Sequence, residues 1–482
     1  MKNRILFVSL AVVLAAGLGL VGCGGPTPEP EGPETVMVGM ARDLNEDLVF
    51  FECNAAGPVV RWFVDKVNSE GGVHLSEYDT DTEDWYADIE LVVRDFSLAT
   101  WDIGTVTQGL IDDGADFIWG GPATDTIYTQ APICNAAAVP LITLEGGASK
   151  MVWEHESYLD VWPYVWVTLS FANWYEIPVL YGMIDAEVDT PTAYCTYIGQ
   201  AGAEHGLEYF QETENQFGAE NVIDAGAHAY TLDSEAANTI IQSAKSALNT
   251  TPYDIFCAWT YPWNVAELIG ACIANDFNPP AIAFGPGGNF ESYSSVYFGP
   301  MMEGILSFTM ANNKTEVAVG TPTMTMDELY DAIAAQIEDD WANVSHCPQG
   351  EGFTSGYDQL DWWGHPCYAA ALEMWKYAVE EVGDVDGAEV RNVLASYTPA
   401  DPATTVFGDT WYAVFPEAGG NSTLRTGGGV MDYLCHTGEI GQWQSGIFET
   451  VGYDGITGDL PNYDVTADFV FPMTDQWTWL LD

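Results

Sequence analysis

Residues 110–143, LIDDGADFIWGGPATDTIYTQAPICNAAAVPLIT, contain the pattern that decides the fold. Two short apolar runs, Asp116–Trp119 and Val139–Thr143, indicate buried strands, and residues 127–137 between them indicate a helix. Gly120-Gly121 gives the tight turn that a short link from strand to helix needs. Because a strand, a helix and a second strand with short links form a βαβ unit, the two strands are predicted to be parallel.

The same alternation extends along the chain in both directions. Before this stretch, strands are expected at Val36–Met40 and Asp88–Val93, with a helix at Gly57–Asn68 between them. After an aromatic stretch, the pattern resumes at Ala193 and gives a second series of similar size. Further strands are expected at Ala193–Ile198, Asn221–Ala225, Asp254–Trp259 and Pro280–Phe284, further helices at 103–111, 201–217, 235–247, 263–275, 326–342, 366–382 and 387–396, and β structure in the tail from residue 405. We therefore predict an α/β fold with two doubly wound lobes, whose strand ends face each other across a cleft.

The N-terminus has the layout of a secretory signal. Met1–Arg4 carries two basic residues, and Ile5–Gly22 is an apolar run without charge. The pattern disfavours a short transmembrane helix. Pro and Gly follow the apolar run directly, and the basic residues of a stop-transfer signal are absent after it. No other apolar run reaches the length that spans a bilayer, so the body of the chain is expected to be soluble.

Leu20-Val21-Gly22-Cys23 resembles the bacterial lipobox. The resemblance implies that residues 1–22 are a lipoprotein signal peptide and that Cys23 receives lipid after cleavage. An ordinary signal peptide with an incidental cysteine is the alternative. Residues 23–35 then form an acidic, Pro-rich linker, which stays extended because proline fixes φ and like charges repel.

The charge balance of the chain is strongly acidic. Its 482 residues include 71 Asp and Glu against 12 Lys and Arg, a formal net charge of −59. Such a surface repels nucleic acid and anionic membranes, so no nucleic-acid partner is expected. The acids are spread along the whole chain, which favours a well-hydrated surface suited to a saline habitat over a patch that binds a cationic substrate.

The chain has nine cysteines. If Cys23 carries lipid, an even number remains outside the membrane, which permits disulfides. The spacing leaves the pairing open. We take Cys347 with Cys367, which flank a loop, as the first expected pair, and we expect Cys257 to be a small core residue in a strand. No CxxC and no Cys/His cluster with zinc spacing occurs, so neither a metal nor a cofactor is predicted.

Two polar loops follow neighbouring strands of the first series, at the ends where open α/β sheets bind ligands. The candidate ligand-binding residues in them are Thr124, Asp125 and Thr126 in the first loop and Gly147 and Ser149 in the second. At the start of a helix, hydroxyls can cap free N–H groups or, together with those groups, hold a polar group of a ligand. The sequence leaves both roles open. Neither loop contains GxGxxG or GxxxxGK[ST], so a nucleotide is not predicted.

Aromatic and glycine-rich loops follow two strands of the second series. The candidates in them are Trp259 and Tyr261 in the first loop, and Gly287 in the second. Aromatic rings at strand ends can cover an apolar or cationic group of a ligand. Packing in the core or between the lobes is the alternative for each ring.

Arg42 directly follows the first predicted strand, in a chain with few basic residues. It could pair with a ligand carboxylate. The nearby acids Asp43, Glu46 and Asp47 offer a simpler pairing, which we favour.

These segments together resemble the type I periplasmic solute-binding proteins of ABC transporters, in particular the branch that binds branched-chain amino acids and amides. The segments that carry the resemblance are Val67–Val73, Leu91–Phe96, Leu110–Pro140, Ala281–Leu306, Tyr368–Ala370 and Gly441–Gly446. Each motif is short, and their order and spacing from about residue 36 to 450 make the likeness specific.

The resemblance implies two lobes joined by three crossing strands and hinged around a ligand. It places residues 36–160 and 312–410 in the N-terminal lobe, and residues 161–311 and 411–482 in the C-terminal lobe. Thr124, Asp125 and Thr126 then lie in the first ligand loop, Gly147 and Ser149 lie in the second, and Tyr261 covers the ligand. It also implies an extracytoplasmic receptor, anchored by lipid to the cell membrane, that delivers a small ligand to permease subunits.

The chain departs from the family where amino-acid receptors have G-P-E-G, whose Glu holds the ligand ammonium. Here Gly287 takes that position. Either Asp125 supplies the negative charge, or the ligand lacks an α-ammonium and is an amide, an aromatic acid or another small apolar compound. Residues 78–85 form an acidic insert, for which a solvated loop is expected rather than a Ca²⁺ site, because the glycine and distal Glu of an EF-hand are absent.

Two other functions remain as alternatives. An extracytoplasmic sensor that works with a separate membrane partner would use the same ligand site. An extracellular hydrolase is disfavoured, because no Gly-x-Ser-x-Gly elbow occurs and His155, His365 and His436 are isolated from one another. The prediction is therefore a binding protein and not an enzyme.

Overall fold

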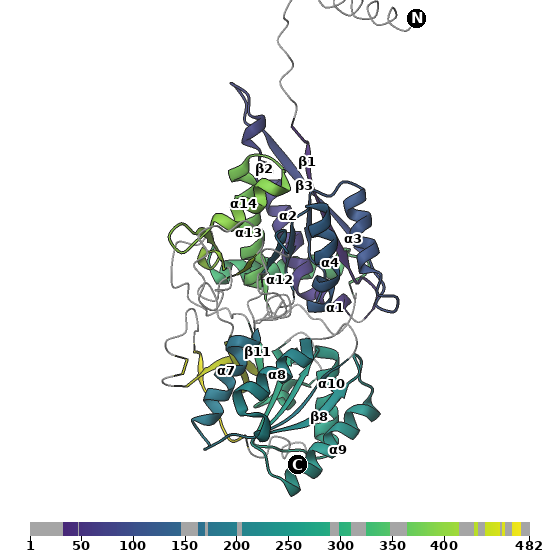
Figure 1. The fold of residues 1–482 in the computed structure, drawn as a ribbon, viewed down its shortest axis with the longest axis vertical. Helices are drawn as coiled ribbons and strands as arrows, with labels where there is room; N and C mark the ends of the chain where they lie inside the picture. The colour runs from purple at the N-terminus through teal and green to yellow at the C-terminus, as the bar shows by residue number, and fades with distance from the viewer. Residues whose placement is uncertain are drawn as a thin grey trace, which may run out of the picture.

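The computed structural model describes residues 32–46, 48–145, 162–168, 172–199, 205–289, 298–309, 324–347, 364–413, 429–431, 439–453, 456–457 and 465–473. Two α/β lobes lie one beyond the other along the long axis of the molecule (Figure 1). This arrangement confirms the predicted fold class. Cys23, the signal peptide, Gly147 and Ser149 lie outside the described residues.

The first lobe is built on an eight-stranded sheet in the order β14-β15-β6-β5-β4-β1-β3-β2. The bounds are β1 Thr35–Arg42, β2 Val73–His74, β3 Tyr86–Asp95, β4 Phe117–Trp119, β5 Leu141–Thr143, β6 Val165–Val167, β14 Tyr412–Ala413 and β15 Gly429–Met431. The predicted βαβ unit is present, because β4 and β5 pair in parallel. β1 pairs in parallel with β3 on one side and with β4 on the other, so the strand order reverses at β1.

Helices pack on this sheet in two separate groups, as both faces of a parallel sheet require. α2 contacts α12 and α13, whereas α3 contacts α4. The helix predicted at Gly57–Asn68 is present as α2, and one face of it is buried, including Val59, Phe63 and Val67. The bounds are α1 Val49–Asn54, α2 Ala56–Ser69, α3 Ile103–Asp112, α4 Thr124–Ala137, α12 Met326–Asn343, α13 His365–Val382 and α14 Gly387–Ser396.

The second lobe repeats this plan with a sheet in the order β18-β17-β16-β11-β10-β9-β7-β8. Its strands are β7 Ala193–Ile198, β8 Val222–His228, β9 Ile255–Thr260, β10 Ala281–Pro286, β11 Leu306–Thr309, β16 Glu439–Gln444, β17 Ile447–Gly452 and β18 Ala467–Asp468. Its helices are α7 Ala172–Asp185, α8 His205–Phe217, α9 Ser234–Thr250 and α10 Pro262–Ala274. The strand order reverses at β7, which pairs in parallel with β8 and β9.

The chain passes between the two sheets three times, after β6, after β11 and after β15. β6, β14 and β15 belong to the first sheet, although the expected lobe boundaries assigned residues 161–311 and 411–482 to the second lobe. The β structure expected in the tail is present from β12 (Ala403–Thr405) and β13 (Gly408–Thr410) onward. Among the described helices, none combines the length and the apolar composition that crossing a bilayer requires.

Candidate ligand-binding site

The first polar loop lies at the point where the strand order of the first sheet reverses. It follows β4, and β4 is the parallel neighbour of β1. The backbone of the loop packs closely on the end of β1, because a Cβ on Gly121 would lie 3.0 Å from the carbonyl oxygen of Ala41. The Gly121 N–H donates to Oε1 of Gln130 at 2.8 Å, which fixes the turn into α4. Open α/β sheets bind ligands at this position.

The start of α4 holds three of the predicted residues, Thr124, Asp125 and Thr126, all of which are buried. The hydroxyl of Thr126 donates to the carbonyl oxygens of Pro122 and Ala123, each at 2.8 Å, so it stabilises its own turn. The N-cap is Ala123, which has a φ of 69° and no side-chain acceptor. A non-glycine residue in this region is strained, and such strain is found at functional sites.

The second lobe places Tyr261 opposite this loop. Tyr261 follows β9, is the N-cap of α10 and is 3% exposed. Its ring stacks on Trp263 with centroids 4.9 Å apart and lies 5.5 Å from Tyr230. It also makes an edge contact with Phe51 of α1, a residue of the first lobe, at 6.4 Å. We call Tyr230, Tyr261 and Trp263 the aromatic group.

Two carboxylates act on Tyr261 from opposite lobes. Burial raises its pKa well above the ordinary range, and the charges of Asp125 in the first lobe and Glu208 in the second raise it further. Glu208 in turn accepts a hydrogen bond at 3.1 Å from the hydroxyl of Tyr128 on α4. Because Tyr128 and Glu208 belong to different lobes, this contact joins the lobes directly.

Two of the predicted residues have other roles. Trp259 is fully buried, stacks on Phe308 at 5.4 Å and donates its indole N–H to Thr213 at 3.1 Å, contacts that favour packing within the second lobe. At Gly287, a Cβ would lie 2.6 Å from the backbone carbon of Tyr261. The close approach of η3 (Gly287–Asn289) to α10 therefore excludes a side chain such as Glu at this position, and Gly287 supports the Tyr261 backbone instead.

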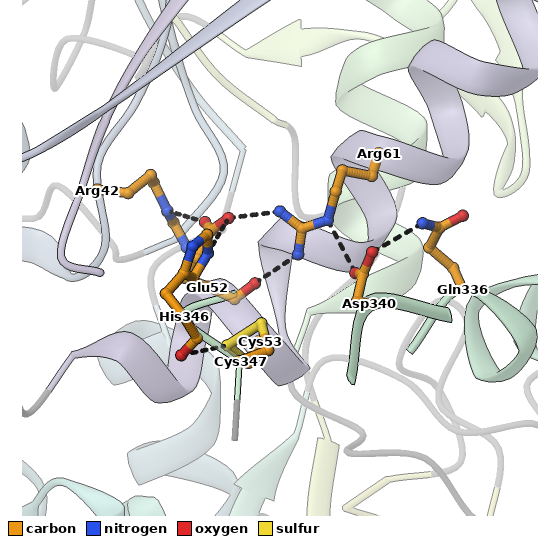
Figure 2. Close-up of a disulfide and its surroundings, with 8 residues drawn as sticks. All are labelled: Arg42, Glu52, Cys53, Arg61, Gln336, Asp340, His346 and Cys347. Atoms are coloured by element: carbon orange, nitrogen blue, oxygen red, sulfur yellow. Dashed lines mark hydrogen bonds and ion pairs between the residues drawn. A yellow bond between two sulfur atoms is a disulfide. The ribbon is translucent and has the colours of Figure 1, made fainter. Parts of the chain in front are cut away.

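Arg42 is the centre of a buried charge network at the end of β1 (Figure 2). Its guanidinium donates to Glu52 at 2.8 Å and to Glu145 at 2.6 Å. Glu52 also accepts from Arg61 at 2.5 Å, and Arg61 donates to Asp340 at 2.8 Å. The favoured partners Asp43 and Glu46 were wrong, because the side chain turns into the lobe rather than along the loop. The third favoured partner, Asp47, lies outside the described residues.

The charges of this network shift one another in opposite directions. Burial lowers the pKa of Arg42, but Glu145 and Glu52 more than offset this and raise it above the ordinary value. Burial raises the pKa of Glu52, but Arg61, His346 and Arg42 outweigh it and lower the pKa to about 2. The network therefore holds Glu52 ionised inside the lobe.

A disulfide lies next to Glu52 and His346 of the network (Figure 2). It joins Cys53 at the end of α1 to Cys347 after α12, with Cα atoms 5.4 Å apart, so the expected pairing of Cys347 with Cys367 was wrong. The partners are 294 residues apart in the sequence, and only the packing of α1 against α12 brings them together. Cys257 is a buried core residue, as predicted.

Two groups of side chains within the described residues bring possible metal ligands within 4.8 Å of one another. They are Cys53, His346 and Cys347, and His74, Asp79 and Asp84. The sulfurs of the first group are bonded to each other. The second lies in and beside the acidic insert, where Asp79 accepts from the N–H of Trp85 at 2.6 Å and orders the turn. We assign no metal to either group.

The sequence reasoning missed the residues that join the lobes. Tyr128 lies in the second turn of the helix that follows β4, and Glu208 lies in the first turn of the helix that follows β7, so a search of the first two helical turns as well as the loops would have found them. Phe51 carries no such signal, because α1 is a short helix within the connection from β1 to α2. The candidate site therefore includes four side chains from the two lobes: Asp125, Tyr128, Glu208 and Tyr261.

Three solved structures show the class of fold to which this arrangement belongs. The branched-chain amino acid transporter substrate binding protein LivJ from Streptococcus pneumoniae, in complex with isoleucine, matches with a TM-score of 0.60 and 13% identity over 91% of this chain and 100% of that one. A solute binding protein of an ABC transporter from Rhodopseudomonas palustris BisB5, in complex with 3,4-dihydroxybenzoic acid, matches with a TM-score of 0.60 and 12% identity, over 87% of this chain and 97% of that one. A solute binding protein from R. palustris in complex with benzoate matches with a TM-score of 0.59 and 16% identity, over 90% of this chain and 99% of that one.

The chain matches no protein-family model and no curated protein. It has the fold of the type I periplasmic binding proteins of ABC transporters, as its motifs predicted. The similar structures are named as substrate-binding and solute-binding proteins of transporters.

Proposed function

We propose that this chain is the solute-binding receptor of an ABC importer and that it binds a small amino acid-like or amide ligand between its lobes. The observation that carries the proposal is the convergence of Asp125 and Tyr128 from one lobe with Tyr261 and Glu208 from the other. All four follow the carboxyl ends of parallel strands, where open α/β sheets bind ligands. Thr124 belongs to the same turn and is a further candidate contact.

Binding between two lobes gives such a receptor its signal. A ligand that contacts both lobes binds the closed arrangement better and shifts the population toward it. Closure by hinge rotation changes the outer surface that a permease recognises. The hydrogen bond between Tyr128 and Glu208 is a contact that closure would form.

The leader supports a location outside the cytoplasm. Residues 1–22 fit a lipoprotein signal peptide, Cys23 fits the lipidated residue and residues 23–35 fit a linker. In cells, Cys23→Ala should move the protein from the membrane fraction to the soluble extracytoplasmic fraction. A variant that still sediments with membranes would contradict lipid attachment at this residue.

A thermal-shift screen tests the receptor function. Amino acids, amides, amines, short peptides and aromatic acids are added singly, because a ligand that binds only the folded protein raises its melting temperature. We expect one chemical class to raise it and Tyr261→Ala to abolish the effect. Hydrolysis of an ester or glycan, without stabilisation by any of these compounds, would favour an enzyme instead.

A further inference from the structure

Glu176 of α7 is a buried carboxyl group with little to balance its charge. The residue is 1% exposed. One oxygen accepts a hydrogen bond at 3.3 Å from the hydroxyl of Tyr209, and the other, Oε1, has no hydrogen-bond partner in the part of the chain that the structure describes. A buried carboxylate is unfavourable unless a cation pairs with it.

Glu176 lies at the end of the second lobe that faces the first. α7 begins shortly after the chain leaves β6 of the first lobe, and Glu176 is in its second turn. Tyr209 is in the second turn of α8, next to Glu208, which receives the hydrogen bond from Tyr128 across the lobes. The charges of Glu176, Glu208 and Tyr261 all act on the Tyr209 hydroxyl. Glu176 therefore belongs to the same end of the lobe as the aromatic group.

The helix ends at the site are already supplied with negative charge. A helix N-terminus favours an anion, because its free N–H groups carry partial positive charge. Asp125 lies in the first turn of α4 and Glu208 in the first turn of α8, so each helix provides its own anion. A ligand carboxylate at either end would meet an acidic side chain of the protein.

The two arginines of the first lobe near this end are committed to acidic partners. Arg42 pairs with Glu52 and Glu145, and Arg61 pairs with Glu52 and Asp340. Although Nη2 of Arg42 has no hydrogen-bond partner among the described residues, two carboxylates offset its charge. The aromatic group adds ring faces, which attract cations and not anions.

We propose that this site recognises an organic cation, whose ammonium group pairs with Glu176 and Asp125 while the aromatic group covers its carbon skeleton. The inference rests on the proposed receptor function and names the class of ligand. Glu176 supplies a carboxylate on the lobe where Gly287 leaves no room for one. No ligand carboxylate is required for binding.

Ligands matched in shape but not in charge test the inference. Leucinamide, at a pH where its amine is protonated, is compared by calorimetry with leucine and with 4-methylpentanamide, which lacks the amine. Putrescine provides a second cation without a side chain. At least one of the two cations should bind about tenfold or more tightly than leucine and 4-methylpentanamide, because a hydrogen bond to a charged partner is the strong kind.

Glu176→Gln tests the role of the buried carboxyl group. The amide keeps the size of the side chain and an acceptor for Tyr209 but removes the charge. Its affinity for the cation should fall about tenfold or more, while the melting temperature without ligand should not fall. Asp125→Asn should weaken binding in the same way from the other lobe. Glu235→Gln, at an exposed position on α9, is the control and should change neither quantity.

Three results would overturn the inference in distinguishable ways. Tighter binding of leucine or benzoate than of either cation would contradict the ligand class and leave the receptor function standing. Unchanged affinity of Glu176→Gln and Asp125→Asn for a bound cation would contradict the assigned partners. Failure of every compound in the broader screen to bind the folded protein would count against the receptor function itself.

Discussion

The two lobes bring carboxyl groups to their facing ends in opposite ways. In the first lobe, Glu52 and Glu145 are held by Arg42, and a disulfide next to Glu52 closes the assembly. In the second, Glu176 has the Tyr209 hydroxyl and no described cation. The buried carboxyl groups of the first lobe are therefore paired with a cation, whereas no described cation pairs with Glu176 in the second. The first lobe is therefore a preassembled frame, and in our proposal the second provides a carboxyl group that pairs with a ligand cation.

The largest test of this contrast is Arg42→Met. The change leaves Glu52 and Glu145 buried with one cation fewer, so the free energy of unfolding should fall by about 3–5 kcal/mol. Urea denaturation measures the loss. Arg94→Met removes an exposed pair with Asp113 in the same lobe and should cost less than about 1 kcal/mol. Equal losses in the two variants would show that the buried pairs of Arg42 contribute no more to stability than an exposed pair.

Acid should act on Glu52 and Glu176 with opposite signs. The pKa of Glu52 is lowered to about 2 in the folded protein, so the unfolded chain binds its proton more readily. The stability that Glu52 contributes is present above its ordinary pKa and is lost as pH falls from about 4.5 to about 2, by roughly 3 kcal/mol. Unfolding curves from pH 6 downward measure the loss, and Glu52→Gln should lack that part of the slope. An unchanged slope would contradict the pairing.

The disulfide should strengthen the first lobe alone. Replacing both Cys53 and Cys347 with Ser should lower the free energy of unfolding by about 2–4 kcal/mol, because the link restricts the unfolded chain. A reductant should destabilise the wild type by a similar amount and should leave the double variant unchanged. If reduction destabilised both equally, another disulfide would have to carry the effect.

Glu176→Gln should raise the free energy of unfolding, whereas the variants of the first lobe should lower it. Burial raises the pKa of Glu176 well above its ordinary value, and the hydrogen bond from Tyr209 offsets only part of this, so the folded state holds the proton more tightly than the unfolded chain. Wild-type stability without ligand should therefore fall as pH rises through and above the ordinary carboxyl range. At pH 7 the Gln variant should be more stable than the wild type, because it buries no group that loses a proton in the unfolded chain. A destabilised variant would indicate a structural role for the charge.

The order of strands and helices was predictable because local signals specify it. The apolar runs at β4 and β5, with the helix between them, were recognisable without any knowledge of packing. The loop at Thr124 and the aromatic Tyr261 were placed correctly at strand ends, since the carboxyl ends of parallel strands share one edge. Local sequence was therefore enough to locate the facing ends of both lobes.

The partners of charged and sulfur-containing residues could not be predicted, because they come from distant segments. Arg42 meets Glu145, which is 103 residues away, and Cys53 meets Cys347. Trp259 was misleading for another reason: a strand buried on both faces has no alternation that shows which side chains point toward the core. Glu176 gave no signal, since its burial depends on how α7 packs on α8.

The central claim is that the two facing ends form one ligand site. Calorimetric affinity for a compound that raises the melting temperature tests it most directly, measured for Asp125→Asn in the first lobe and Tyr261→Ala in the second. We expect each variant to remain folded by circular dichroism and to lose affinity about tenfold or more for the same compound. Wild-type affinity in either variant would contradict a site shared by the lobes.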